Sequence, residues 1–293
     1  MTYTLLIADR SYSSWSLRGC LTFACFGIPV EFETTRLYEP GFAEDLKRYV
    51  PAKTVPALRL PEGGVLTDSI AIAEEVAFRH PNAKLWPSDP VDRALARSMV
   101  AEMHSGFVAL RDACPMNIRT AYTETPVSEA VRADLARLEY LWSLAPGPGP
   151  WLFGDYSIAD VFFAPVAMRI AAYTLPVGEA AQALVAAHLA HPEIRKWRAL
   201  ALCDAPQAFY RRDYPEKDWP GPEPLPARAS EGGPAVNALC PYSSKPVTHF
   251  LELDGRIYGF CNETCRNKTL NDPAAWPAFA ELAGIEAAIA PTA

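Results

Sequence analysis

The sequence has no long apolar run and no excess of positive charge. None of its apolar stretches approaches the roughly 18 residues of a membrane-spanning helix, so we expect no membrane span. The formal net charge is −7, which gives no support for nucleic-acid binding because that normally needs a basic face. The first residues, Met1 to Ile7, lack the basic region and cleavage site of a signal peptide and have the pattern of a first strand.

The chain has an odd number of cysteines, seven in 293 residues. In a chain without an export signal, we expect these thiols to stay reduced and the protein to be cytoplasmic. Some thiols are then available for metal or redox chemistry. Half of the residues are hydrophobic and 21% are charged, an ordinary balance that can fill a core. The length predicts roughly two domains, with room for a third small one.

Residues 1–82 predict an α/β domain. Residues 3–8 form an apolar, β-leaning run, and residues 30–37 alternate apolar with polar side chains, as strands do. Pro61-Glu62-Gly63-Gly64 is a hairpin turn signal. The expected elements follow the order βαβαββα, with strands at 3–8, 30–37, 55–60 and 65–67 and helices near 15–26, 41–50 and 69–79.

The rest of the chain divides into three further parts. Residues 90–211 are rich in Ala, Leu and Arg at helical spacing and predict an all-helical domain with one core. Residues 212–236 hold a run of prolines that predicts a semi-rigid, extended linker. Residues 237–280 predict a small Cys-rich module, close to the size at which a metal is usually needed for independent folding.

A hydroxyl-rich turn, Ser11 to Trp15, precedes the first helix. A hydroxyl and the free backbone N–H groups at a helix start can stabilise a thiolate. Ser11, Ser13 and Ser14 are all candidates for that hydroxyl. The alternative is that these serines only cap the helix, since serine is a preferred N-cap residue.

This turn, the pair Val55-Pro56, the pair Asp68-Ser69 and the segment Ser157-Ile158-Ala159-Asp160 together resemble the glutathione S-transferase family. The resemblance covers residues 3–210 and implies a thioredoxin-like domain followed by the family's all-helical domain. The turn is similar to that of zeta-like serine transferases. Ser157 and Asp160 also have the Ser-x-x-acid spacing of a capping box, so we assign them to folding and not to the site.

The resemblance implies a glutathione-binding role for several residues. A cis bond at Val55-Pro56 would turn the Val55 backbone toward the cysteinyl part of glutathione, as an added strand would. Asp68 and Ser69 would bind the γ-glutamyl group, with the helix N-terminus serving its carboxylate. Lys53 is a candidate for binding the glycine carboxylate, and Trp15 is a further candidate glutathione-binding residue. Alternatively, the proline is trans and Asp68-Ser69 is an ordinary helix cap.

The active hydroxyl is left open between three serines. A match without gaps to the zeta-like enzymes, counted back from Arg18, selects Ser11. The geometry of the turn favours Ser13 or Ser14 instead. Further candidates are the acid-binding cations Arg10, Arg18 and Arg119, and the acceptor-site lining Met103, His104, Phe107 and Arg111.

A second signal lies near the other end of the chain. Cys240, Cys261 and Cys265 resemble the ligands of a TRASH or YHS-type metal-binding module, with an Asp-Gly hairpin before Cys261. Three thiolates suit zinc or another soft metal, and a closed tetrahedron needs a fourth ligand. His249 is the nearest candidate for that ligand, although a lone histidine in a strand usually has a packing role. The alternative is three buried thiols in a small core.

The sequence therefore predicts a glutathione transferase that conjugates or isomerises a small hydrophobic or acidic electrophile. The resemblance implies a homodimer. A second hypothesis is a catalytically weak transferase scaffold whose C-terminal cysteines bind or sense metal. A glutathione-dependent disulfide exchanger ranks last, because it needs a reactive cysteine at the helix start, whereas Cys20 and Cys25 fall on apolar positions inside the helix.

Overall fold

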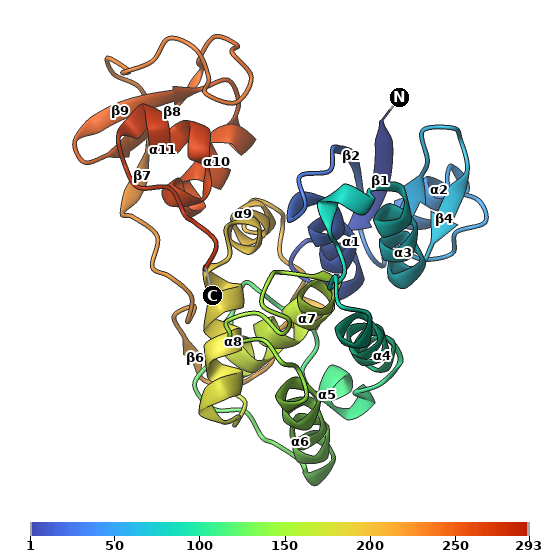
Figure 1. Ribbon diagram of the computed structural model, residues 1–293. Helices are drawn as coiled ribbons and strands as arrows, with labels where there is room; N and C mark the ends of the chain where they lie inside the picture. Colours follow the sequence, from blue (N-terminus) through green and yellow to red (C-terminus); the bar gives the residue numbers. More distant parts are fainter. Residues whose placement is uncertain (1, 292–293) are drawn as a thin grey trace. The chain divides into compact units, whose positions relative to one another are not determined.

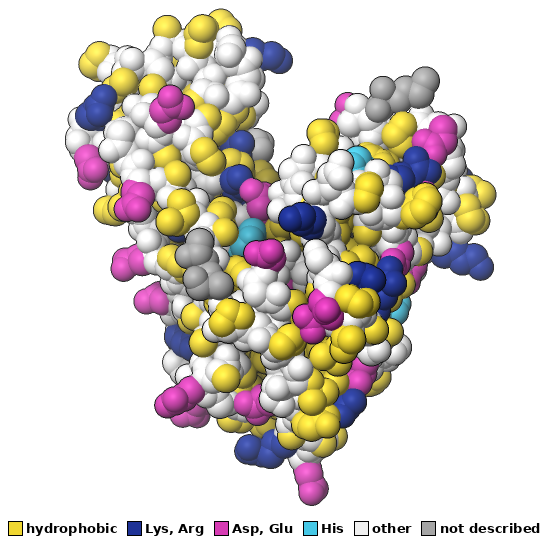
Figure 2. All heavy atoms as spheres, in the orientation of Figure 1, with side chains coloured by type: hydrophobic (Ala, Val, Ile, Leu, Met, Phe, Trp, Pro, Cys, Tyr) yellow, Lys and Arg dark blue, Asp and Glu magenta, His cyan; other side chains and the backbone are white. Residues whose placement is uncertain are grey.

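The computed structural model describes residues 2–291, which divide into two units. Unit 1 holds residues up to 188 together with 207–220, and unit 2 holds residues 189–206 and 221–291. Figure 1 shows the elements of each unit. On the face drawn in Figure 2, basic and acidic side chains of the described residues are interspersed, so this face carries no field of one sign. Within residues 2–291, no helix combines the length and apolar character needed to cross a membrane.

Unit 1 begins with the predicted α/β domain. Its four-stranded sheet has the order β2-β1-β3-β4, in which β2 is parallel to β1 while β3 and β4 are antiparallel to their neighbours. The order βαβαββα is confirmed, with β1 at Tyr3–Ala8, α1 at Ser14–Ala24, β2 at Val30–Thr35, α2 at Gly41–Lys47, β3 at Ala57–Arg59, β4 at Val65–Thr67 and α3 at Ser69–Arg79.

Helix α1 lies close to the Val55-Pro56 segment. A Cβ atom added at Gly19 would lie 3.0 Å from the Pro56 Cβ atom and 3.3 Å from Leu5 Cδ2. Glycine at this position therefore lets the helix approach the sheet and the proline. The peptide bond between Val55 and Pro56 is cis, as the resemblance implied.

The second part of unit 1 is helical, as predicted. Helix α7 contacts α1 and α4 and is buried along its whole length. The capping box at its start is confirmed: the Ser157 side chain accepts from the helix backbone, and Asp160 Oδ2 accepts from Ser157 N at 2.9 Å. The helices are α4 at Pro90–Ser105, α5 at Val108–Ala113, α6 at Glu129–Ser143, α7 at Ile158–Tyr173 and α8 at Glu179–Ala190.

The segment 207–220 returns to unit 1 after α9. It contains the short helix η2 at Ala208–Tyr210 and the strand β6 at Glu216–Lys217, which pairs with β5 at Ala121–Tyr122. Hydrogen bonds fix its start: Gln207 Nε2 donates to Asp9 Oδ1, and Gln207 N donates to the Tyr12 hydroxyl, both at 2.9 Å.

Unit 2 is a three-stranded antiparallel sheet with helices packed against it. The sheet order is β7-β8-β9, with α10 contacting all three strands. The described elements are α9 at Pro192–Ala201, β7 at Ala227–Ser230, β8 at His249–Leu253, β9 at Arg256–Phe260, α10 at Glu263–Asn271, η3 at Pro273–Ala275 and α11 at Pro277–Ala283. Asp254 and Gly255 both have positive φ and form the predicted hairpin turn.

Two segments differ from the sequence-based ranges. Helix α9 lies in the range predicted for the helical domain, 90–211, yet it packs in unit 2. Periodicity identifies the buried face of a helix but not the partner of that face. The predicted linker 212–236 contains β6 and β7. Both are short, and β7 lies at the edge of its sheet, where nearby prolines are tolerated.

Candidate glutathione and metal sites

A pocket of about 720 Å³ lies in unit 1, beside the start of α1 and the start of α3. Its wall includes Ser13, Trp15, Val55 and Asp68 from the predicted set. Four residues that are distant in the sequence thus meet around one space. The remainder of the wall is Tyr12, Leu37, Tyr38, Glu39, Pro40, Phe42, Ala43, Thr54 and Tyr210.

Among the three candidate serines, Ser13 alone belongs to the pocket wall. It is the N-cap of α1: its Oγ accepts from Ser16 N at 3.2 Å and donates to Ser16 Oγ at 2.8 Å. Ser14 is buried in the first turn of the helix. Ser11 is also buried, and its Oγ accepts from Arg119 Nη1 at 3.4 Å. Ser13 thus combines the capping role with access to the pocket.

Asp68 occupies a strained position at the start of α3. Its backbone has φ +78°, a region that non-glycine residues rarely adopt. Oδ1 accepts from Ile70 N at 2.8 Å, which makes Asp68 the N-cap of the helix. Oδ2 lies 3.2 Å from His104 Nε2 on α4. Such strain is typical of positions that the surrounding structure holds for a function.

Ser69 follows Asp68 and is fully buried. Its Oγ has no hydrogen-bond partner among the residues that the structure describes. Because a buried polar group without a partner is costly, this hydroxyl is expected to bond to something outside the chain. It lies in the first turn of a helix, where backbone N–H groups favour an anion.

Two arginines, the buried Arg18 and the half-buried Arg111, lie close to the indole of Trp15. The guanidinium carbon of Arg18 lies 5.4 Å from the ring centroid, and that of Arg111 lies 5.0 Å from it. Arg18 is 1% exposed, and burial, followed by the like charges of Arg111 and Arg169, lowers its pKa. Its Nε and Nη1 atoms have no partner among the described residues. Both arginines thus lie within cation–π distance of Trp15.

The other predicted residues lie away from the pocket wall. Lys53 is exposed and Pro56 is buried. Met103 and Phe107 are core side chains. Arg10 lies half-buried in the turn after β1.

Comparison with known proteins identifies the family. The model of the glutathione S-transferase N-terminal domain matches residues 12–77. Maleylacetoacetate isomerase of Rattus norvegicus is 30% identical over 161 residues, which cover 53% of this chain and 72% of the rat protein. The enzyme of that name from Pseudomonas aeruginosa is 31% identical over 53% of this chain and 76% of its own length. The chain belongs to the glutathione S-transferase family.

A solved structure agrees with this fold. A glutathione transferase homologue from Burkholderia, determined with bound glutathione, superposes with a TM-score of 0.54 at 23% identity. The superposition covers 70% of this chain and all of that one. The thioredoxin-like domain followed by a helical domain is therefore the fold of unit 1, as the family resemblance implied.

Sequence reasoning missed part of this transferase pocket. Tyr12 and Tyr210 stack with ring centroids 4.4 Å apart and an interplanar angle of 10°, and both rings line the pocket with Tyr38. Tyr12 lies within the hydroxyl-rich turn Ser11 to Trp15, so its place beside the pocket could have been predicted from the sequence. Tyr210 lies almost 200 residues further along the chain, and no local pattern connects the two.

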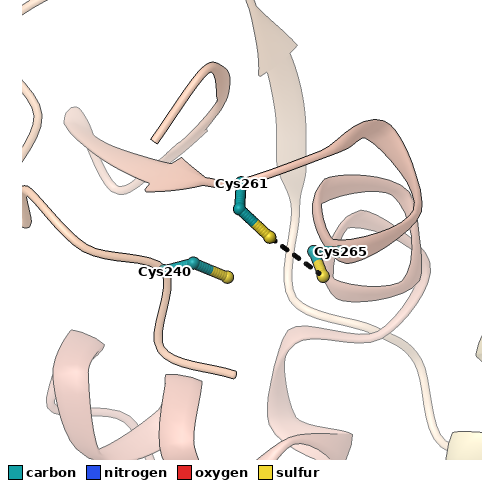
Figure 3. Close-up of side chains that lie close together, drawn as sticks. All are labelled: Cys240, Cys261 and Cys265. Carbon is teal, nitrogen blue, oxygen red and sulfur yellow. Dashed lines mark hydrogen bonds between the residues drawn. The ribbon is translucent and has the colours of Figure 1, made fainter. Parts of the chain in front are cut away.

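The three predicted metal ligands come together in unit 2. Their sulfur atoms all lie within 4.8 Å of one another, and Cys261 Sγ is 4.0 Å from Cys265 Sγ. Figure 3 shows Cys240 on a loop, Cys261 after the end of β9 and Cys265 on α10, with the side chains pointing toward one another. Cys261 therefore follows the strand and precedes the helix that carries Cys265.

Polar groups around this cluster favour thiolates. Ser243 Oγ donates to Cys261 Sγ at 3.1 Å, and Asn262 Nδ2 donates to it at 3.4 Å. Burial raises the pKa of Cys240, but hydrogen bonds, first from the backbone of Cys261, outweigh burial and lower that pKa to about 7. Burial and then the charge of Cys240 raise the pKa of Cys265. A cation among the three sulfurs would relieve that repulsion.

His249 does not join the cysteine cluster. Its Nδ1 is 2.9 Å from Thr248 Oγ1, and the residue pairs with Phe260 across the sheet. The prediction of His249 as the nearest fourth ligand is therefore not supported by the geometry. The alternative reading, a packing or surface histidine, describes its position.

Proposed function

We propose that this chain binds glutathione in the pocket of unit 1, activates its thiol and directs it at a small electrophile. The observation that carries the proposal is the buried Ser69 hydroxyl, which has no partner among the described residues, beside the strained Asp68. Both stand at a helix start next to a pocket large enough for a tripeptide and a small second substrate. Membership of the glutathione S-transferase family supports the same activity.

Glutathione is positioned by its backbone in this proposal. Its γ-glutamyl carboxylate bonds to the Ser69 hydroxyl and the N–H groups of α3, while its amine pairs with Asp68. Its cysteinyl part pairs with the backbone of Val55, beside the cis-proline. The thiol then lies at the start of α1, near Ser13.

The thiol is activated by electrostatics. The first N–H groups of α1 have no intrahelical partner, and the helix dipole adds partial positive charge there. The Ser13 hydroxyl donates to Ser16 Oγ in the described structure and would turn its proton toward the thiolate. Both effects favour the anion and so lower the pKa of the bound thiol.

Two reactions are open to such a thiolate. In conjugation, sulfur forms a bond to an electrophilic carbon, and a leaving group such as chloride departs with its bonding electrons. In isomerisation, sulfur adds to one carbon of a cis double bond, the remaining single bond rotates, and the thiolate leaves to regenerate glutathione. The relatives named maleylacetoacetate isomerase favour the second reaction on a maleyl-type acid.

The pocket wall suits an acceptor with a planar or apolar part and a carboxylate. The stacked rings of Tyr12 and Tyr210 form an apolar wall. Close to Trp15, Arg18 and Arg111 supply a positive potential that favours an acidic substrate.

The proposal includes a cytoplasmic homodimer. The homodimer is supported by two exposed apolar side chains, Phe78 on α3 and Val91 on α4, which are 82% and 74% exposed. Large apolar side chains at the surface are typical of interfaces when they gather in patches. Light scattering at micromolar concentration tests this: a monomer mass would contradict it.

A second candidate function is metal binding by Cys240, Cys261 and Cys265. The convergence of three sulfurs supports it, because soft thiolates select zinc, copper(I) and similar ions. When bound, such an ion supplies positive charge between the sulfurs. In the competing hypothesis the transferase fold is a scaffold and the cysteine cluster is the functional part. That hypothesis expects little or no turnover of glutathione, whereas the leading proposal expects turnover.

One experiment separates these possibilities. The purified protein is assayed with glutathione and either a chloroaromatic acceptor or a maleyl-type acid, and glutathione affinity is measured by calorimetry. We expect turnover with at least one acceptor and saturable binding. Absence of both turnover and glutathione binding would reject the transferase proposal and leave the scaffold.

A further inference from the structure

We propose that Cys240, Cys261 and Cys265 form an exchangeable soft-metal site with one coordination position open to an external thiol. The proposal rests on metal binding by this cluster, as proposed above, and not on the transferase activity. It goes further by assigning the metal a ligand-exchange role in place of a structural one. Two features of unit 2 carry it: the number of protein ligands and the core that surrounds them.

The ligand set is incomplete for a structural site. Structural zinc is almost always bound by four protein ligands in a tetrahedron. Within the part of the chain that the structure describes, no His, Asp or Glu joins the three cysteines. With metal–sulfur bonds of about 2.3 Å, sulfurs in a tetrahedron lie about 3.8 Å apart and in a trigonal plane about 4.0 Å apart. The 4.0 Å separation of the Cys261 and Cys265 sulfurs suits either arrangement.

The nearest polar groups are also poor fourth ligands. Ser243 and Asn262 direct hydrogen-bond donors at Cys261 Sγ, and donors of this kind stabilise a ligating thiolate from outside the metal's own shell. Neither a neutral serine hydroxyl nor an amide is a preferred ligand of a soft ion. The fourth position therefore falls to a ligand from solution.

Unit 2 does not need a metal to hold it together. The sequence analysis considered residues 237–280 alone and found them close to the size at which a domain needs a metal in order to fold. The structure adds helix α9 and strand β7 to that segment and gives the unit its own apolar core. The core side chains that are 2% exposed or less include Leu251, Leu253, Tyr258, Phe260, Phe279 and Ala280, together with Ala199, Cys240 and Ala275.

Polar contacts reinforce the attachment of α9. Arg195 forms two hydrogen bonds with the Asp272 carboxylate, Nε to Oδ2 at 2.8 Å and Nη2 to Oδ1 at 2.7 Å. Asn271 Nδ2 donates to Ala199 O at 3.0 Å. Such paired, nearly buried contacts fix one arrangement of the elements. Because these contacts hold the unit together without a metal, a metal bound here can exchange without unfolding the unit.

A cation stands beside the cluster. Lys268 Nζ lies 3.7 Å from the Tyr242 ring centroid and 3.9 Å from that of Trp276. The lysine is one helical turn after Cys265. Three thiolates and a divalent ion carry one net negative charge, which this ammonium offsets. The bound complex is then close to neutral, and a further thiolate can approach it. Glutathione is the thiol that the proposed transferase activity already requires.

The test uses the full chain loaded with zinc, studied by X-ray absorption at the zinc edge. We expect one zinc per chain, bound by three sulfurs and one light atom. Addition of glutathione, or of mercaptoethanol as a smaller probe, should replace the light atom with a fourth sulfur. Four protein ligands before thiol is added, or a light atom that excess thiol leaves in place, would overturn the open position.

Thermal unfolding of the same sample separates exchange from structural support. Removal of zinc by a chelator should lower the melting temperature of unit 2, because any bound ligand stabilises the folded state, but should leave unit 2 folded at 25 °C. Unfolding of unit 2 on chelation would show that the metal is structural and would overturn the proposal.

Matched variants complete the experiment. Cys265→Ser should lose stoichiometric zinc, while Cys203→Ser, a change at a thiol outside the cluster, should keep it. Transferase turnover is measured in parallel and should persist in Cys265→Ser. A chain that binds no zinc but turns over glutathione would reject the metal site alone. A chain that binds zinc but does not turn over would reject the transferase proposal alone.

Discussion

His104 Nε2 lies 3.2 Å from Asp68 Oδ2, so a side chain of α4 holds a carboxylate of the pocket wall in place. The centroid of the His104 ring also lies 6.4 Å from that of the Phe162 ring. Asp68 is thus restrained through both oxygens, by its own helix through Oδ1 and by His104 through Oδ2. His104 acts through Asp68 and is a positioning residue for glutathione.

Replacement of His104 should weaken glutathione binding without slowing the chemical step. We expect His104→Leu to raise KM for glutathione about fivefold, the effect of about 1 kcal/mol from a lost hydrogen bond, with kcat within a factor of two. His104→Gln, which keeps a donor, should recover most of the affinity. Steady-state kinetics of both variants checks this, and an equal loss of kcat would show a different role.

Ser69→Ala should have opposite effects on stability and on binding. It removes a buried hydroxyl that lacks a partner among the described residues, so the free protein should keep its stability or gain up to about 1 kcal/mol. Glutathione affinity should fall roughly fivefold to tenfold, because the γ-glutamyl carboxylate loses a donor. Denaturant unfolding and calorimetry measure the two effects. Ser98→Ala, an exposed serine on α4, serves as the control and should change neither.

Ser13→Ala should reduce kcat/KM at least about tenfold, which corresponds to a rise of one unit in the thiol pKa. It should also cost about 1 kcal/mol of stability through the lost N-cap. Ser13→Asp separates the two effects, because a carboxylate restores the cap but repels a thiolate.

The matched variants for this prediction are Ser11→Ala and Ser14→Ala, which should keep most of the activity. The thiolate absorbance of bound glutathione, followed against pH, reports the pKa directly. If Ser11→Ala abolishes activity while Ser13→Ala keeps it, the assignment made from the alignment without gaps is the correct one.

His191 should make the stability of unit 2 depend on pH. It is the buried N-cap of α9, and its Nδ1 accepts from Glu193 N at 3.2 Å. Burial, with a smaller contribution from Lys196, lowers its pKa to about 4, compared with about 6.5 in an unfolded chain. The unfolded state therefore binds the proton more readily between these values. The associated stability is complete above pH 6.5 and is lost as pH falls to 4.

The expected size of this effect is of the order of 3 kcal/mol. His191→Asn keeps a capping acceptor without a titrating group, so its unfolding free energy should vary less between pH 6.5 and 4. Denaturant titrations at several pH values compare the two proteins. Equal slopes against pH in both would show that His191 is not the group responsible.

The first domain could be predicted because its signals are local. Gly27 follows its first helix and Pro81 follows its last, and Ser13 and Asp68 cap the starts of these two helices. The pairs Val55-Pro56 and Asp68-Ser69 could be recognised because each is contiguous in the sequence. Their meeting at one pocket follows from the order of the strands.

Contacts between distant segments could not be predicted in this way. The His104–Asp68 pair depends on the packing of α4 against the first domain, and the Tyr12–Tyr210 stack depends on the return of residues 207–210. No periodicity in either segment specifies the partner. The same reason explains α9, whose apolar face was evident while its destination in unit 2 was not.

The placement of α9 has a consequence for protein engineering. Along the chain, residues 189–206 serve unit 2, residues 207–220 serve the transferase fold, and the chain then returns to unit 2. The cysteine module is therefore not a detachable tail. A truncation after residue 220 would leave Ala199 and Leu200, which pack in the core of unit 2, without their partners. To express unit 1 or unit 2 alone, the segments of that unit must be joined by new connections, because shortening the chain does not separate the two units.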